Sequence, residues 1–243
     1  TAFKNSEESV YEEKKMEEME VCFLMDHFGY MKLIDKNAYE RNKEAVHNEN
    51  KYVFNCMNTD KICIFTDTGK MHTIKAVDIP LGRFRDKGTP VDNLSNYDSS
   101  QERMLYVAPV GQLRSDRLLF VTKTSMCKLV EGAEFDVAKR TIASTKLADE
   151  DELIFIGSAS EMEQIVLQSH GGCFLRFLTQ EVSTMKKTAL GVRGMKLADD
   201  DYLEHAYLLA GHQEYTISYH DKEYALNKVR LAKRDTKGIK PRI

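Results

Sequence analysis

The chain repeats one pattern of apolar and polar positions. A short apolar run is followed by a polar turn and then by a second run in which polar or basic residues alternate with apolar ones. The pattern occurs five times, in residues 21–34, 62–74, 118–130, 165–177 and, less clearly, 215–226. Two extended runs joined by a tight turn predict a β-hairpin in each copy.

The turns of these hairpins are predicted from the residues that tolerate a positive φ angle. Gly29, Gly69 and Gly172 occupy matching places in three copies, and glycine adopts this conformation without steric cost. We expect Ser125 and Lys222 to stand at the same place in the third and fifth copies.

The period predicts the fold. Successive turns are 40 to 56 residues apart, which is typical of one four-stranded unit per repeat in a propeller. Residues 104–109, 152–157 and 203–209 are further apolar runs that supply a third strand. We therefore predict an all-β, propeller-like ring of five or six four-stranded blades, because a single such sheet cannot bury both faces alone.

The first 20 residues differ from the rest. They carry seven Glu and three Lys, and we expect an acidic lead-in or linker over 1–20, followed by the propeller over 21–243. An acidic tail that competes with an anionic ligand for a basic surface is the alternative interpretation of this segment. The chain also begins without Met, so it is expected to be a fragment of a longer protein.

Composition excludes several classes. Hydrophobic residues make up 42% and charged residues 30% of the chain, which is a globular composition. No apolar run is long enough for a membrane helix. Five Cys without a Cys-x-x-Cys pair predict free, buried thiols in a reducing cytoplasm. Common nucleotide-binding, metalloprotease and hydrolase motifs are absent from the sequence, and no metal site is predicted.

Two runs of acidic residues precede third strands, at 148–152 and 198–201. We interpret them as loops that cap the strand starts, with a divalent-metal site as the alternative.

Basic residues recur at one place in successive repeats, in the loop that follows each hairpin. The formal net charge of −3 argues against a nucleic-acid ligand, but the distribution argues for one, because repetition would put these loops on one edge of the ring. The candidate DNA-binding residues are Arg41, Lys43, Arg83, Arg85, Lys87, Lys139, Arg140, Lys186, Lys187, Arg193, Lys196, Lys233, Arg234 and Lys237. Such a rim would neutralise duplex phosphates without reading sequence.

Four segments resemble a known family. Residues 65–71, 84–94, 149–154 and, most specifically, the Gly-Val-Arg-Gly-Met-Lys-Leu run at 191–197 look like the C-terminal domain of the A subunit of bacterial type IIA topoisomerases, DNA gyrase and topoisomerase IV. The resemblance covers about residues 20–243. It implies a β-pinwheel, in which blades exchange strands and a basic outer rim binds and bends duplex DNA.

The resemblance also implies what this chain lacks. In such enzymes the catalytic Tyr, ATP and Mg²⁺ belong to other domains, so no cofactor is expected here. The expected partners are duplex DNA, the ATPase B subunit, and the remainder of the A subunit, in the cytoplasm with the nucleoid and without a membrane. A propeller that serves as a protein-interaction module is the alternative, and it predicts little DNA affinity.

One departure from the family affects the expected activity. In gyrase, the A subunits carry a Gly- and Arg-rich box in the first blade loop, needed for tight chiral wrapping. The matching stretch here, 39–49, keeps Tyr39, Arg41 and Lys43 but has no Gly. We therefore expect weaker phosphate binding at this loop, and a domain of the topoisomerase IV type or an atypical gyrase domain.

Overall fold

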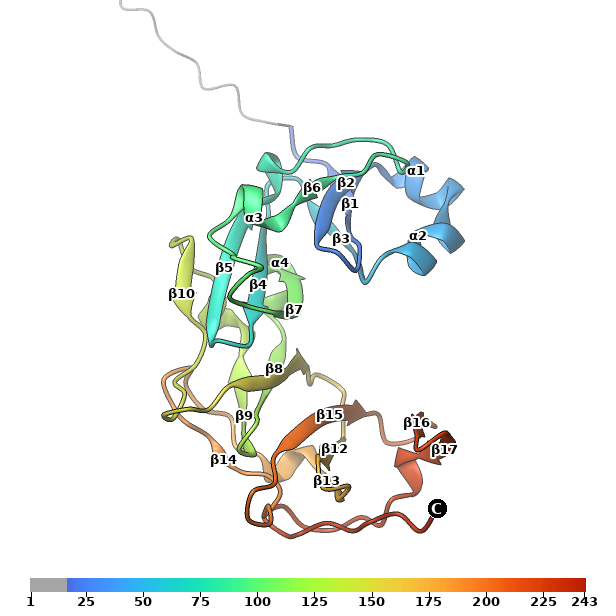
Figure 1. The fold of residues 1–243 in the computed structure, drawn as a ribbon. Coiled ribbons are helices and arrows are strands. Elements are labelled where there is room, and N and C mark those ends of the chain that lie inside the picture. Colours follow the sequence, from blue (N-terminus) through green and yellow to red (C-terminus); the bar gives the residue numbers. More distant parts are fainter. Residues whose placement is uncertain (1–16) are drawn as a thin grey trace, which may run out of the picture.

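The computed structural model describes residues 17–243, which form five antiparallel sheets (Figure 1). We call these sheets blades 1 to 5. The central hairpins are β1 (Glu20–Met25) with β2 (Tyr30–Ile34), β4 (Lys61–Thr66) with β5 (Lys70–Lys75), β8 (Arg117–Thr122) with β9 (Met126–Glu131), β12 (Gln164–Ser169) with β13 (Phe174–Leu178), and β16 (Thr216–Tyr219) with β17 (Lys222–Ala225). All five predicted hairpins are confirmed.

Each of blades 1 to 4 has a third strand beside the first strand of its hairpin. These strands are β3 (Tyr52–Met57), β7 (Met104–Pro109), β11 (Leu153–Ser158) and β15 (Leu203–Leu209). The last three are the third strands that the apolar runs predict. In the described residues, blade 5 consists of its hairpin alone.

The outermost strand of a blade comes from the repeat that follows it. The strands β6 (Thr89–Pro90), β10 (Thr141–Ala143) and β14 (Val192–Arg193) lie after the hairpins of blades 2, 3 and 4, yet they pair with β2, β5 and β9 of the preceding blades. Ile239 pairs in the same way with Phe174 of blade 4. This exchange ties each blade to the next and is the β-pinwheel arrangement.

The turns follow the prediction in four copies and differ in the fifth. Gly29, Gly69, Gly172 and Ser125 have φ between +74° and +89°. In blade 5 the residues with positive φ are His220 and Asp221, at +49° and +59°. The prediction that Lys222 occupies the turn is therefore wrong. Two residues separate β16 from β17, whereas three or four separate the strands of the other hairpins, so Lys222 already begins β17.

The segment after the first hairpin folds into two short helices, α1 (Lys36–Arg41) and α2 (Lys43–Glu49). Asp35 caps α1, because its Oδ1 accepts a hydrogen bond from the backbone N–H of Ala38 at 2.7 Å. Ala38 and Val46 pack against Cys22, Leu24 and Ile34 of blade 1. The loop predicted over 39–49 is therefore helical. The strand that follows it, β3, pairs with β1 of the same blade and is not exchanged.

The remaining helical elements are single turns. They are α3 (Val91–Leu94), α4 (Val110–Leu113) and the 3-10 turns at Ala76–Asp78, Gly132–Phe135, Thr179–Glu181 and Leu226–Lys228. Among residues 17–243, no helix has both the length and the apolar composition that a membrane crossing requires.

The hydrophobic core lies between neighbouring blades. Ile64 packs in the cluster between blades 1 and 2, whereas the next residue, Phe65, packs with Phe120 and Phe135 between blades 2 and 3. Successive side chains of a strand point to opposite faces, so both faces of a middle blade are buried. This explains why the first hairpin strands of blades 2 to 4 contain runs of consecutive apolar residues, whereas β16 of blade 5 alternates polar and apolar residues.

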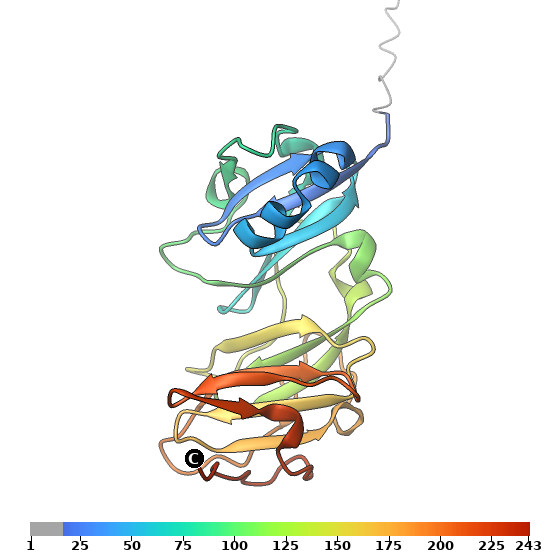
Figure 2. The same cartoon turned by 90° about the vertical axis from the view of Figure 1, so that its right-hand side faces the viewer.

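The blades form an open arc rather than a closed ring. Blade 1 with α1 and α2 lies at one end and blade 5 at the other, and both views show them apart (Figures 1 and 2). The strands β3, β7, β11 and β15 line the inner side, and the exchanged strands lie on the outer side.

Two further predictions concern the termini and thiols. The acidic segment 1–20 lies mostly outside the described residues, and the first strand, β1, begins at Glu20. All five Cys are free; Cys173 is half-buried and the other four are buried.

Candidate nucleic-acid interface

Three basic segments project from the outer edge of the arc. Each exchanged segment first pairs in parallel with the preceding blade, through Leu81, Thr184 or Leu231. It pairs again eight residues later, at Thr89 of β6, Val192 of β14 or Ile239. The residues between the two contacts leave the sheet. We call these stretches, 83–87, 186–190 and 233–237, the three bulges. They carry most of the predicted DNA-binding residues.

A glycine ends each bulge and allows the chain to return to the sheet. Gly88, Gly191 and Gly238 have φ of +86°, +106° and +72°. A Cβ at these positions would lie 2.5–2.7 Å from the backbone oxygen of Met31, Cys127 or Phe174 in the preceding blade. Both the positive φ and this close approach require glycine. In blade 2 Thr141 stands at the equivalent place, and the basic stretch 136–140 lacks the first, parallel contact.

The first residue of each bulge is basic and exposed: Arg83, Lys186 and Lys233. The second residue faces inward, since Phe84 is buried and Lys187 and Arg234 are half-buried. Neighbouring basic residues that are both predicted to bind DNA therefore differ in exposure: the first of each pair is exposed and the second is half-buried.

The two inward basic residues, Lys187 and Arg234, already have protein partners. The Arg234 guanidinium donates to the backbone oxygens of Glu181 and Arg193 at 2.9 and 2.8 Å. Lys187 Nζ donates to the backbone oxygen of Glu134 at 3.3 Å. These contacts hold the bulges against the preceding blade.

The other twelve candidate residues are exposed. Arg85 lies 3.9 Å from a Glu49 oxygen, and Arg193 lies 3.4 Å from Asp235. Exposed ion pairs of this kind are weak, so a phosphate could replace the carboxylate. Arg41 and Lys43 lie on the α1–α2 segment, and Lys139 and Arg140 precede β10.

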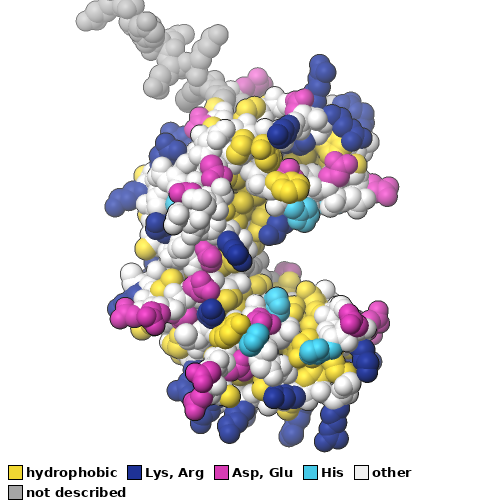
Figure 3. Space-filling view, viewed as in Figure 1, with side chains coloured by type: hydrophobic (Ala, Val, Ile, Leu, Met, Phe, Trp, Pro, Cys, Tyr) yellow, Lys and Arg dark blue, Asp and Glu magenta, His cyan; other side chains and the backbone are white. Residues whose placement is uncertain are grey.

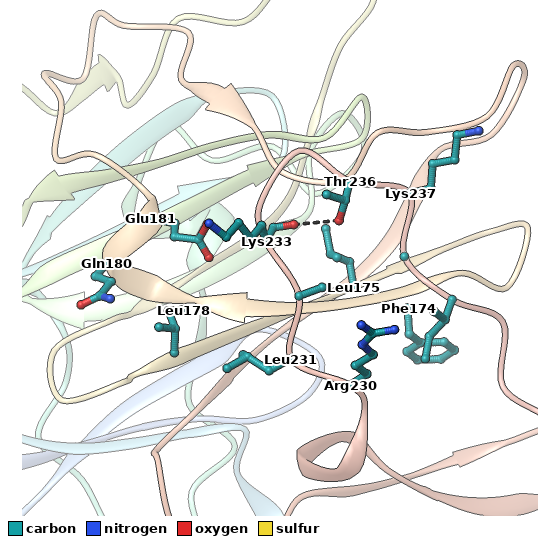
Figure 4. A pocket seen from close by; sticks show the side chains of 13 residues that line it. Phe174, Leu175, Leu178, Gln180, Glu181, Arg230, Leu231, Lys233, Thr236 and Lys237 are labelled. Carbon is teal, nitrogen blue, oxygen red and sulfur yellow. Dashed lines mark hydrogen bonds between the residues drawn. The ribbon is translucent and has the colours of Figure 1, made fainter.

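Lys and Arg side chains lie along much of the outer circumference in the space-filling view (Figure 3). Asp and Glu side chains reach the same edge, so this edge carries both acidic and basic groups. A close view of the bulge at 233–237 shows Lys233 extending toward Glu181 and Lys237 pointing away from the blade (Figure 4).

The acidic runs have local structural partners. The Asp151 carboxylate accepts hydrogen bonds from the Thr124 backbone N–H at 3.1 Å and from its hydroxyl at 2.6 Å. Asp201 accepts from the Gly171 N–H at 2.8 Å. Each run thus caps the hairpin turn of its own blade. Within residues 17–243, no group of three or more His, Cys, Asp or Glu is placed to hold a metal ion.

Two lysines that are absent from the predicted DNA-binding set lie beneath bulges. Lys32 and Lys128 are in the second strands of the hairpins in blades 1 and 3, each three residues after the positive-φ turn residue. Because both lysines stand at the same position of their repeats, a comparison of the repeats could identify them from the sequence alone.

Known proteins share this sequence pattern. A family model for the DNA gyrase C-terminal domain, a β-propeller, matches residues 60–99, 116–160 and 163–210, which is more than half of the chain. The DNA gyrase A protein of Ureaplasma parvum is 27% identical over 184 residues, covering 73% of this chain and 22% of that protein. The DNA gyrase A protein of Klebsiella oxytoca is 29% identical over 194 residues, covering 75% and 22%. This chain therefore spans about a fifth of the length of these curated relatives.

Solved structures share the fold. The C-terminal domain of DNA topoisomerase IV superposes with a TM-score of 0.79 at 22% identity, covering 92% of this chain and 73% of that one. The C-terminal domain of E. coli ParC gives 0.71 at 15% identity, with 92% and 94% covered. The C-terminal domain of DNA gyrase A gives 0.60 at 18% identity, with 91% and 76% covered.

The family model spans the middle three repeats, and the strand exchange extends the same architecture to blade 1 and toward blade 5. Sequence and fold therefore agree, and this chain belongs to the family of DNA gyrase C-terminal domains, the β-pinwheel domains of the A subunits of DNA gyrase and topoisomerase IV.

Proposed function

We propose that this domain binds duplex DNA through its phosphates, without sequence preference, along the outer edge of the arc. The observation that carries the proposal is the exposed basic residue at the start of all three bulges, in the same register of three exchanges. Lys and Arg gathered on one edge can neutralise the phosphates of a duplex backbone. Relatives named as DNA gyrase and domains named for topoisomerase IV support it.

The role in a larger enzyme is part of the same proposal. The domain would present DNA to the strand-passage core of a type II topoisomerase, to which an ATPase B subunit would also belong. The catalytic Tyr, ATP and Mg²⁺ would belong to those other parts. A cytoplasmic, nucleoid-associated location also stays a prediction.

Salt dependence tests DNA binding. About five phosphate contacts, each contributing a slope near −0.9, should lower the affinity for a 30-base-pair duplex roughly 10²- to 10³-fold between 50 and 200 mM salt. Fluorescence anisotropy with two unrelated duplexes should give the same slope for both. An affinity that does not change with salt would contradict phosphate binding and favour the protein-interaction alternative.

We further propose that the domain bends the duplex without wrapping it chirally. Two observations support this: residues 39–49, where a gyrase box would lie, form α1 and α2 instead of a glycine-rich loop, and the fold is closer to the topoisomerase IV domain than to the gyrase domain. A bend of a 20–30-base-pair segment costs about 1–6 kcal/mol, which several phosphate contacts can offset.

Topoisomer analysis separates bending from wrapping. Relaxed circular DNA is incubated with the domain and a nicking-closing enzyme, and the linking-number distribution is read on a gel. We expect no shift at concentrations that retard the same DNA. A shift of the linking-number distribution in either direction would show chiral wrapping and contradict the bending proposal.

A further inference from the structure

We propose that Lys32 and Lys128 are positioning residues that hold two of the basic bulges in the shape that binds DNA, without contacting DNA themselves. The inference rests on the proposed function and adds to it two lysines, one buried and one half-buried, that act through the exposed residues.

The contacts are the same in both blades. Lys128 Nζ donates to the backbone oxygens of Lys187 and Ala189, at 2.9 and 2.7 Å. Lys32 Nζ donates to the backbone oxygens of Phe84 and Asp86, the latter at 2.7 Å. Counted back from Gly191 and Gly88, the four accepting residues occupy identical places, four and two residues before the glycine. Each ammonium therefore fills the inside of a bulge and ties two of its carbonyl groups to the hairpin.

Burial shows that these lysines are not ordinary surface groups. Lys128 is only 2% exposed, and in the described part of the chain no carboxylate forms an ion pair with it. Burial lowers its pKa to about 8, although the nearby Glu134 acts in the opposite direction. Burial also lowers the pKa of Lys32. Burying an ammonium group costs free energy unless the group is hydrogen-bonded. The hydrogen bonds to the backbone carbonyls therefore offset the cost of placing a lysine here.

The accepting carbonyls define the direction of the exposed side chains. Lys187 directly follows Lys186, and Phe84 directly follows Arg83. Fixing the carbonyl of the second bulge residue restrains the backbone next to the first residue. The exposed cation is then pre-oriented for a phosphate, and less entropy is lost when DNA binds.

The other blades provide an internal comparison. In blade 4 the equivalent position is Leu175, and an open pocket lies beneath the bulge, lined by Leu175, Leu178 and Leu231 among others (Figure 4). There the bulge is closed by its own hydrogen bond, from the Thr236 hydroxyl to the Lys233 backbone oxygen at 2.7 Å. In blade 2 the position is His72, whose Nδ1 lies 2.9 Å from Thr141 Oγ1 of the exchanged strand. The lysine contacts are thus confined to blades 1 and 3.

A double-mutant cycle on duplex affinity tests the proposal. Lys128→Met and Lys186→Met should each weaken binding roughly threefold, because both remove the contribution of the same oriented cation. Because Lys128 acts through the bulge, adding Lys186→Met to Lys128→Met should weaken binding no further. Lys233→Met is the matched control, since its bulge has no lysine beneath it, and its effect should be unchanged in the Lys128→Met background.

Three outcomes would overturn the proposal. Multiplicative effects of Lys128→Met and Lys186→Met would show that Lys128 acts independently of the bulge. Unchanged affinity in Lys128→Met would show that it has no positioning role. Loss of the Lys233→Met effect would point to general destabilisation. If Lys128→Met does not fold, the same cycle with Lys32→Met and Arg83→Met applies, because Lys32 is less buried.

Hydrogen exchange tests the role of Lys128 independently of the proposed DNA binding. Amides of residues 185–190 should exchange at least tenfold faster in Lys128→Met, whereas those of β8 should not change. If the unmodified domain shows no salt-dependent duplex binding, the proposed function fails, yet this exchange experiment still tests the lysine contacts. Unchanged exchange at 185–190 would overturn them.

Discussion

The double charge reversal Arg83→Glu with Lys186→Glu is expected to weaken duplex binding more than 30-fold near 100 mM salt, and to reduce the salt slope by about two. Both side chains are exposed and begin a bulge on the outer edge. Each reversal removes one phosphate contact and adds a charge that repels the neighbouring phosphates. The measurement is fluorescence anisotropy over a series of salt concentrations.

The matched control is Lys51→Glu with Lys222→Glu, which changes the net charge by the same amount. Both lysines are exposed and lie near the hairpin-turn ends of blades 1 and 5, since the Lys51 N–H donates to Met25 at the end of β1 and Lys222 directly follows the turn. We expect less than a threefold change in affinity. Equal losses in the two double variants would mean that overall charge, and not the bulges, determines binding.

Gly191→Ala is expected to destabilise the domain by about 2–4 kcal/mol, because a residue with φ of +106° is strained and its Cβ would meet the Cys127 backbone oxygen at 2.6 Å. Thermal unfolding should begin at a temperature lower by roughly 5 °C or more. The strain falls on the exchanged strand β14, so the tie between blades 3 and 4 should loosen first.

Gly111→Ala is the control for this variant. Gly111 lies in α4 and is exposed, and a Cβ there would meet only the movable side chain of Asp60. Its stability should change by less than about 1 kcal/mol, in either direction. A Gly191→Ala domain as stable as the unmodified one would show that the exchanged strand does not require the close approach.

The local parts of the fold could be predicted from the sequence. Turn residues and apolar runs are short-range signals, so the five hairpins and three of the third strands were predicted with nearly correct ends. The two-residue strands β6 and β14 carry no periodicity of their own, and their partners lie in another repeat. The resemblance implied strand exchange, whereas the pattern of the residues alone did not.

The resemblance implies a loop over 39–49, whereas the chain forms α1 and α2 there, with Asp35 as a favourable N-cap. The fifth turn was misplaced because His220 and Asp221 adopt positive φ without glycine. The same limit applies to the interface. Lys186 and Lys187 look equivalent in the sequence, yet the bulge turns one outward and the other inward. Phe84, which occupies the inward place in blade 1, is the one sequence signal for this difference.

The central claim is that duplex DNA lies along the outer edge, across the three bulges. Hydrogen exchange of the domain with and without saturating duplex DNA tests this claim most directly. We expect slower exchange at 83–87, 186–190 and 233–237, and no change at the hairpin turns 26–29, 67–69 and 220–221. Protection confined to the hairpin turns or to the inner strands β7 and β11 would contradict it.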